Sequence, residues 1–304
     1  MKLCKFILRA LSGIVNTAVL AFCLLLFTYG CYAVWDSRQL TQAADAAQYA
    51  IYKPTDKDAR SFAELQEINP DVFGWLNVYG TNIDYPLVQG EDNSKYVSTN
   101  VDGEYSLVGS LFLDCRNRKD FSDFNSIIYG HHMAEDQMFG DIGDFQEKAF
   151  FDSHQYGTLF YGGKTWGLEF FAFLEADAYD EIYSPQGEGQ ESRQAYLNHI
   201  RDLALYTRDV SVSAEDHLVL LSTCTSDVTN GRHLLAGRIT QSVRPDPFWQ
   251  EQEEKQIKGI EAESLRERLE KIPFAGKAAS VIVLLLVFKA GGSVICKKWK
   301  KRKR

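Results

Sequence analysis

A long uncharged stretch near the N-terminus constrains the fold of this chain more than any other feature. Residues 10–35 carry no charged side chain, and Lys2, Lys5 and Arg9 precede them. The stretch exceeds the roughly 20 residues that a helix needs to cross a bilayer. It is also too long for the apolar part of a cleaved signal peptide, and it shows no clean small-residue cleavage site. The sequence therefore predicts a retained signal anchor over residues 1–36, with the N-terminus in the cytoplasm and the remainder outside the cell membrane.

The C-terminus repeats this pattern in reverse. Residues 278–296 are mostly apolar and precede a strongly basic tail at residues 297–304. This order predicts a second transmembrane segment with its tail in the cytoplasm. Lys289 opposes that interpretation, because a cation well inside a membrane helix costs about 2.5 to 3.5 kcal/mol unless it snorkels. An amphipathic segment lying on the membrane surface therefore stays open as the alternative.

Charge and cysteine usage limit the possible functions. The chain has a formal net charge of -8, and setting aside the seven cations of the tail and the three near the N-terminus leaves -18 for residues 10–296. This acidic balance argues against a nucleic-acid partner, which requires a basic face. Four of the six cysteines lie in or beside the membrane segments: Cys4, Cys23, Cys31 and Cys296. Cys115 and Cys224 remain; a disulfide between them is possible in an oxidising compartment, but a lone cysteine with histidines elsewhere is typical of a nucleophile.

Between the membrane segments, the sequence pattern changes twice. Residues 37–68 place apolar side chains at helical spacing, which predicts a helical stalk. Turn residues beginning at Asn69 interrupt that pattern and start a folded unit, residues 69–243. Residues 244–277 are largely charged, and they predict a helical linker that returns to the membrane.

The folded unit contains short segments of β-branched and aromatic residues separated by Gly, Asn and Asp. The predicted strands cover residues 74–78, 106–113, 126–129, 157–161, 166–174, 218–222 and 234–243. Many short strands with turns between them predict a mainly β fold, either a sandwich or a barrel. One longer helix is predicted at residues 191–205, before the last two strands. Its shared face comprises Ala195, Tyr196, His199, Ile200, Leu203 and Ala204.

Cys224 stands just after the apolar run of the predicted strand at residues 218–222. A structural cysteine more often lies inside such a run, as a small hydrophobic residue. The neighbours of this thiol are instead polar: Ser222, Thr223, Thr225, Ser226 and Asp227. Polar surroundings favour partial exposure and a reactive thiol.

Two adjacent histidines, His131 and His132, follow the predicted strand at residues 126–129. Adjacent residues of an extended chain point to opposite faces, so at most one of them can face a given cysteine. A metal site is the rival interpretation. It lacks a third ligand at a recognisable spacing, although Glu135 and Asp136 stay open as ligands. We therefore expect neither a metal nor another cofactor.

Two arginines, Arg232 and Arg238, follow Cys224 in the sequence. If the strand that follows the cysteine forms a hairpin with the cysteine strand, an arginine at its start returns beside the thiol. Arg238 would lie farther down the same strand. A surface arginine is the alternative for each, and position favours Arg232 as the functional one.

These motifs together resemble the sortases, a family of cysteine transpeptidases. Residues 220–224, Leu-Leu-Ser-Thr-Cys, and the later Arg232 are similar to the family's Thr-Leu-x-Thr-Cys strand and its arginine strand. Residues 129–133, Tyr-Gly-His-His-Met, resemble the family's segment with the catalytic histidine. In the family this role falls on the first histidine after the glycine, which is His131 here. Similarity to class B members continues at residues 69–76, 80–86 and 109–114. The helix before the cysteine strand also resembles the class B insertion.

The resemblance implies a fold and a mechanism. The fold would be a closed sortase-type β-barrel with short helices and one longer helix before the cysteine strand, flanked by helical membrane-proximal segments. Cys224 would be the nucleophile that forms a thioester, with His131 as proton donor and Arg232 as oxyanion donor. Ser222 and Thr223, which flank the nucleophile, are the candidates for contacts to the substrate peptide.

The resemblance also implies partners on a Gram-positive cell surface. The substrates would be secreted proteins with a C-terminal sorting signal, which likeness to class B suggests is of Asn-Pro-x-Thr type. The acceptor would be an amine of the peptidoglycan precursor, and the enzyme would also contact membrane lipid. Two features depart from class B: Leu220 replaces the usual threonine, and the second membrane segment is more typical of pilin-polymerising sortases. A pilin lysine as acceptor therefore stays open. So do a cell-wall cysteine peptidase, in which water resolves the thioester, and a non-catalytic surface binding module.

Overall fold

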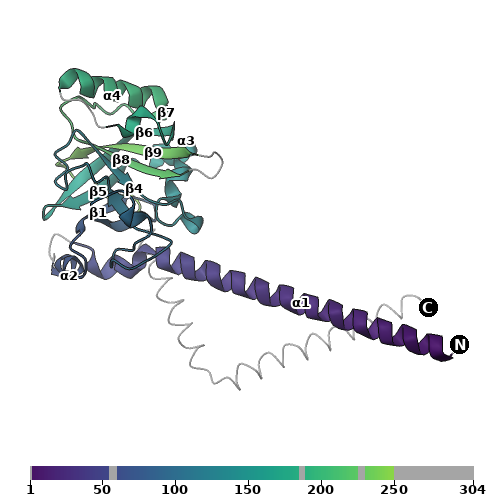
Figure 1. The fold of residues 1–304 in the computed structure, drawn as a ribbon. Helices are drawn as coiled ribbons and strands as arrows, with labels where there is room; N and C mark the ends of the chain where they lie inside the picture. Colours follow the sequence, from purple (N-terminus) through teal and green to yellow (C-terminus); the bar gives the residue numbers. More distant parts are fainter. Residues whose placement is uncertain (1, 55–59, 185–188, 225–229, 250–304) are drawn as a thin grey trace, which may run out of the picture. The chain divides into compact units, whose positions relative to one another are not determined.

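The computed structural model describes residues 2–54, 60–184, 189–224 and 230–249. The predicted second membrane segment, the basic tail and most of the predicted linker lie outside these residues. The uncharged N-terminal stretch lies within one helix, α1 (Lys2–Ala44) (Figure 1). Its apolar side chains are exposed along the described part, and the helix is long and apolar enough to cross a membrane.

Two short helices lie between α1 and the first strand: η1 (Ala46–Tyr52) and α2 (Arg60–Ile68). Asp45 ends α1 and caps η1, because its carboxylate accepts a hydrogen bond of 2.9 Å from a backbone N–H of the first turn. The last residue of α1 is tied to a strand, since the carbonyl of Ala44 accepts a hydrogen bond of 2.8 Å from the Tyr85 hydroxyl. The stalk residues closest to the folded unit thus pack against it.

The predicted closed β-barrel is confirmed. The described residues form one nine-stranded sheet, in which eight strands follow the order β5-β1-β2-β3-β4-β8-β9-β6 and pairing of β5 with β6 closes the ring. The ring strands are β1 (Val72–Val78), β2 (Asp84–Val88), β3 (Leu111–Leu113), β4 (Asn125–Tyr129), β5 (Tyr156–Tyr161), β6 (Lys164–Asp177), β8 (Leu218–Cys224) and β9 (Gly231–Thr240). The ninth strand, β7 (Ala204–Thr207), pairs with β6 outside the ring.

Strand β8 is buried on both faces, which explains the unbroken apolar run before the cysteine. Val219 and Leu221 belong to the main hydrophobic core. Leu218 and Leu220 belong to a second core that includes residues of α4 (Gln190–Leu203). A strand covered on both faces presents no polar face to water, so its sequence does not alternate.

Several predicted elements differ in their bounds from the structure, and two of these differences have a local physical cause. The predicted strand at residues 106–113 is a strand only at β3, because Gly109 adopts a φ of +65° and a Cβ there would lie 2.6 Å from the carbonyl oxygen of Val97. The chain must turn at this glycine. The predicted helix at residues 191–205 ends at Leu203, where the chain enters β7.

Two strands were absent from the sequence prediction. In β2, Pro86 argues against a strand because proline cannot donate a ladder hydrogen bond. The short β7 directly follows the helix, and its first two residues fall within the range predicted as helix. The remaining short helices are η2 (Lys95–Val97), η3 (Ala134–Asp136), η4 (Gly140–Gln146), α3 (Lys148–Ser153) and η5 (Glu181–Tyr183).

Candidate active site

Cys224 is the last residue of β8 and is exposed, whereas Ser222 and Thr223 before it are each only 2% exposed. The antiparallel pairing of β8 with β9 places Arg232 directly opposite the cysteine. Directly paired residues project from the same face of a sheet, so the thiol and the guanidinium share a face. Cys115 and Cys224 are both free, which excludes the disulfide that the sequence left open.

His131 reaches the same end of the barrel by a second pairing. Strands β4 and β8 are parallel, and Tyr129 lies opposite Ser222. Because His131 follows Tyr129 by two residues and Cys224 follows Ser222 by two residues, the strands lead both groups beyond the same edge. The backbone N–H of Gly130 donates to the Ser222 carbonyl at 3.2 Å, which is the last described main-chain bond between the two strands.

The two histidines have different surroundings. Nε2 of His131 lies 2.8 Å from the carbonyl oxygen of Val97. A carbonyl only accepts, so Nε2 carries the hydrogen in this contact and Nδ1 is the ring nitrogen left to accept. His132 is exposed, and its ring lies near Gly143 of η4. His131 thus contacts the segment between β2 and β3 through Val97, the last residue of η2, whereas His132 lies near η4.

The segment that follows His131 holds a strained backbone. Glu135, Asp136 and Met138 have positive φ values of 56°, 56° and 55°. Such conformations are uncommon for residues other than glycine, and they concentrate at functional sites. The Tyr85 hydroxyl accepts a hydrogen bond of 3.0 Å from the Met138 backbone N–H. The histidine segment is thus held by β2, which in turn contacts the end of α1.

The metal alternative receives no support from the histidine pair. Among the described residues, one group of three carboxylates brings its oxygens within 4.8 Å of one another: Asp136, Asp141 and Asp144. Neither His131 nor His132 belongs to that group. Asp136 is the one residue of this group that the sequence had singled out.

Ser222 and Thr223, the predicted substrate contacts, have buried side chains. The Ser222 hydroxyl lies 2.8 Å from the hydroxyl of Tyr183. The Thr223 hydroxyl is buried without a partner in the described part of the chain. Burial raises the pKa of Tyr183 to about 12, while the hydrogen bond with Ser222 and the charge of Arg232 act in the opposite direction. Tyr183 is therefore a neutral phenol that lies against the cysteine strand, and no sequence motif had signalled it.

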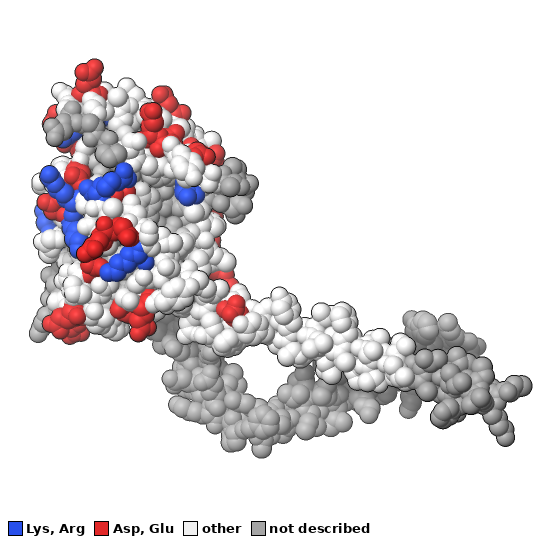
Figure 2. Space-filling view, in the orientation of Figure 1, with Lys and Arg blue, Asp and Glu red and all other residues white. Residues whose placement is uncertain are grey.

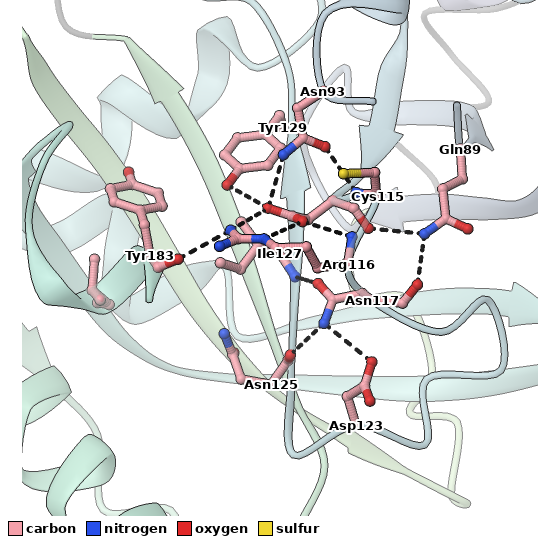
Figure 3. Close-up of polar contacts among 12 residues, drawn as sticks. Gln89, Asn93, Cys115, Arg116, Asn117, Asp123, Asn125, Ile127, Tyr129 and Tyr183 are labelled. Atoms are coloured by element: carbon pink, nitrogen blue, oxygen red, sulfur yellow. Dashed lines mark hydrogen bonds and ion pairs between the residues drawn. The ribbon is translucent and has the colours of Figure 1, made fainter. Parts of the chain in front are cut away.

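A polar network contacts Tyr129 at the end of β4 and the backbone of Tyr183 (Figure 3). Its centre is Asp114, which is 1% exposed and forms an ion pair of 2.7 Å with Arg116. Burial by itself would raise the pKa of Asp114, but hydrogen bonds from Arg116 and Tyr129 outweigh burial and hold that pKa below its ordinary value. The carboxylate is therefore ionised at neutral pH. Sequence analysis missed this pair because two charged residues in a polar loop look like a solvated surface.

Comparisons with known proteins support the family resemblance. No protein-family model matches the chain. A protein described as sortase B from Listeria monocytogenes is 35% identical over 210 residues, which make up 68% of this chain and 83% of that protein.

Solved structures agree in fold. The crystal structure of sortase B from the type II pilus of Streptococcus pneumoniae is 50% identical with a TM-score of 0.53, and the match covers 60% of this chain and 99% of that one. A Streptococcus pyogenes class B sortase involved in pilus biogenesis is 40% identical with a TM-score of 0.54, and that match covers 59% of this chain and 97% of the other. The similarity thus extends over nearly the full length of each of these two solved structures.

Proposed function

This chain belongs to the class B sortase family, and from that premise we propose that Cys224, His131 and Arg232 catalyse a transpeptidation at the outer surface of a membrane. One observation carries the assignment. The register of β8 with β9 pairs Cys224 with Arg232, and the register of β4 with β8 brings His131 to the same edge. Cys224 and Arg232 therefore share a face of the sheet, and His131 follows the neighbouring strand to the same edge, where strands end and backbone ligands can approach.

The first half of the reaction forms a thioester. The Cys224 sulfur gives up its proton to His131 and attacks the carbonyl carbon of the scissile peptide bond. Arg232 donates hydrogen bonds to the oxygen on which negative charge develops. When the carbon–nitrogen bond breaks, His131 passes its proton to the departing amine, and the acyl group stays on the sulfur.

The second half transfers the acyl group to an amine. The incoming amine attacks the thioester carbonyl and loses a proton to His131. The carbon–sulfur bond breaks, a new amide forms, and the proton returns to Cys224. Arg232 steadies the oxyanion again, since this intermediate has the same geometry.

The anchor fits this chemistry. Helix α1 is long and apolar enough to span a membrane, and cations near its N-terminus favour a cytoplasmic N-terminus. The catalytic domain then lies outside, where secreted substrates and lipid-linked precursors arrive at the outer leaflet. Holding the enzyme at that surface raises its effective concentration towards both partners.

The acceptor amine has two candidates. The peptidoglycan precursor is the acceptor expected from likeness to class B. A pilin lysine is favoured by the two solved relatives above, since the more similar one comes from a pilus and the other is involved in pilus biogenesis.

The decisive experiment follows the thioester. The full chain in detergent is incubated with a peptide of Asn-Pro-x-Thr type, and intact-mass spectrometry detects the acyl-enzyme. We expect an adduct on the native protein and none on Cys224→Ala, while circular dichroism shows that the variant is folded. Turnover that survives in Cys224→Ala would refute the assignment.

Product analysis then identifies the acceptor. The reaction is run with a glycine-type amine, with a lysine-bearing peptide and with no added amine. A joined product with one amine identifies the acceptor class. Hydrolysis at the same rate in all three reactions shows a peptidase instead.

A further inference from the structure

The two strands that present the proposed catalytic residues lose their main-chain connection just before those residues. Strands β4 and β8 pair up to Tyr129 and Ser222, and the bond from Gly130 to the Ser222 carbonyl ends the described ladder. His131 and Cys224 both lie beyond this point. Beyond this point no main-chain bond within the described residues joins β4 to β8 directly, so side chains are the contacts that can tie these two strand ends to each other.

One side-chain pair reaches both strands. We propose that Arg116, held by Asp114, is a positioning residue that fixes the strand end bearing His131 relative to the strand end bearing Cys224. This inference rests on the proposed function, because it assigns a role within that reaction.

The Asp114 carboxylate forms the fixed point of this arrangement. It accepts hydrogen bonds from Arg116 Nε at 2.9 Å and Nη2 at 2.7 Å, which is a bidentate pairing. It also accepts from the Arg116 backbone N–H at 2.9 Å and from the Asn93 amide at 3.0 Å. With its oxygens satisfied from several directions, the buried carboxylate holds the guanidinium in one orientation.

The first arm runs to the histidine strand. The Tyr129 hydroxyl donates to Asp114 at 3.0 Å (Figure 3). Tyr129 is the last residue of β4 and lies two residues before His131. Asp114 thus anchors the end of this strand from the side.

The second arm runs to the cysteine strand. Arg116 Nη2 also donates to the carbonyl of Tyr183 at 3.1 Å, and Figure 3 shows this bond joining the two chain segments. The Tyr183 hydroxyl contacts the Ser222 hydroxyl, two residues before Cys224. The rings of Tyr129 and Tyr183 stack with centroids 6.3 Å apart, so the two arms also touch each other.

The choice of substitution separates this role from a purely structural one. The Arg116 side chain is 47% exposed but Asp114 is buried, so loss of the cation would leave a buried carboxylate unpaired and would also destabilise the fold. The geometry of Arg116 is specific, because one planar guanidinium serves the carboxylate and the Tyr183 carbonyl at once. A lysine can restore the charge beside Asp114, but it lacks the rigid fork that both partners need.

The test compares Arg116→Lys and Arg116→Met with the native full chain. Single-turnover acylation by the sorting peptide is measured together with thermal unfolding. We expect Arg116→Lys to unfold close to the native temperature yet to acylate on the order of 10- to 100-fold more slowly, the range expected when reacting groups are misplaced. The loss should appear in kcat, with KM nearly unchanged, because peptide binding is not the affected step.

A matched control and an independent readout complete the test. Arg118→Met removes a neighbouring arginine that is 73% exposed. This variant should keep the native rates of acylation by the sorting peptide and of Cys224 alkylation. The alkylation rate of Cys224 by iodoacetamide, followed by mass spectrometry, should fall in Arg116→Lys without any sorting peptide being present. If the native chain forms no acyl-enzyme, the proposed function fails, and the alkylation rate still decides the role of Arg116.

A second variant covers the case in which Arg116→Met does not fold. Tyr183→Phe removes only the hydroxyl that contacts Ser222 and keeps the carbonyl that Arg116 binds. We expect slower acylation in this variant as well. Native acylation and alkylation rates in both Arg116→Lys and Tyr183→Phe would overturn the inference while leaving the proposed function intact.

Discussion

Strand β9 carries an arginine near each end, and the two guanidinium groups are held differently. Arg238 donates to the Glu169 carboxylate and to the Ser211 carbonyl, both at 2.5 Å. Arg232 donates to the carbonyl of Gly231 at 3.0 Å, its one hydrogen bond within the described residues. A guanidinium has five N–H donors. Arg238 has thus committed donors to the fold, whereas Arg232 retains donors for a ligand.

The same contrast separates two buried carboxylates. Glu169 lies at the end of the barrel away from the thiol, where Arg238 and Arg244 both bind it. Asp114 binds one arginine and a tyrosine that lead towards the proposed site. The charged group around Glu169 therefore joins β6 to β9. On the face drawn in Figure 2, acidic and basic side chains lie next to one another on the folded domain. The comparison predicts which charged residues affect turnover and which affect stability.

The largest effect should come from the arginine beside the thiol. We expect Arg232→Ala to lower kcat/KM by about 10²- to 10³-fold, the cost of removing one oxyanion donor in acyl transfer. Its free energy of unfolding should change little, because the side chain makes few structural contacts. Arg238→Ala is the matched control and should keep native turnover per folded molecule while unfolding more easily. Peptide kinetics and urea denaturation on both variants test the comparison, and the reverse pattern would contradict it.

An intermediate effect should come from Glu169→Gln. The substitution removes the charge that two arginines bind, so we expect a loss of about 1–3 kcal/mol in the free energy of unfolding at neutral pH. Turnover per folded molecule should stay native. Urea denaturation at pH 7 measures the loss, and a variant as stable as the native chain would show that this charged group does not support the barrel.

The pH dependence of the same variant sharpens this prediction. Burial raises the pKa of Glu169, but hydrogen bonds from Arg238 and Arg244 outweigh it and place the pKa below its ordinary value of 4.5. A lowered carboxyl pKa stabilises the fold above pH 4.5, and that contribution is lost as the pH falls through the lowered value. The difference in stability between native chain and variant should therefore shrink on acidification below pH 4.5.

The smallest effect should come from Arg244→Ala. Its side chain is 52% exposed, and Glu169 keeps its bond to Arg238 after the substitution. We expect a loss below about 1 kcal/mol, as for other exposed ion pairs. Thermal unfolding measures it, and a loss as large as that of Glu169→Gln would show that Arg244 is the main partner of this carboxylate.

Local sequence patterns were sufficient for the general architecture. The uncharged stretch at residues 10–35 predicts a membrane-length helix, and α1 contains it. Short strands separated by turn residues predict a β fold, and the family motifs narrow it to the closed barrel that the structure confirms. The strand at Pro86 was missed because its local chemistry opposes the pairing that its neighbours impose. The roles of Cys224, His131 and Arg232 stay predictions until the variants are measured.

The sequence by itself determined which residues bear reactive groups and where most of the strands lie, because burial and turn chemistry act over a few neighbouring residues. Only the tertiary structure decided that β4 runs parallel to β8, which brings His131 to the end of the strand that bears Cys224, and that Arg116 reaches Tyr183. These contacts join segments far apart in the chain. Their partners are selected by the closure of the whole barrel, and no local pattern encodes that choice.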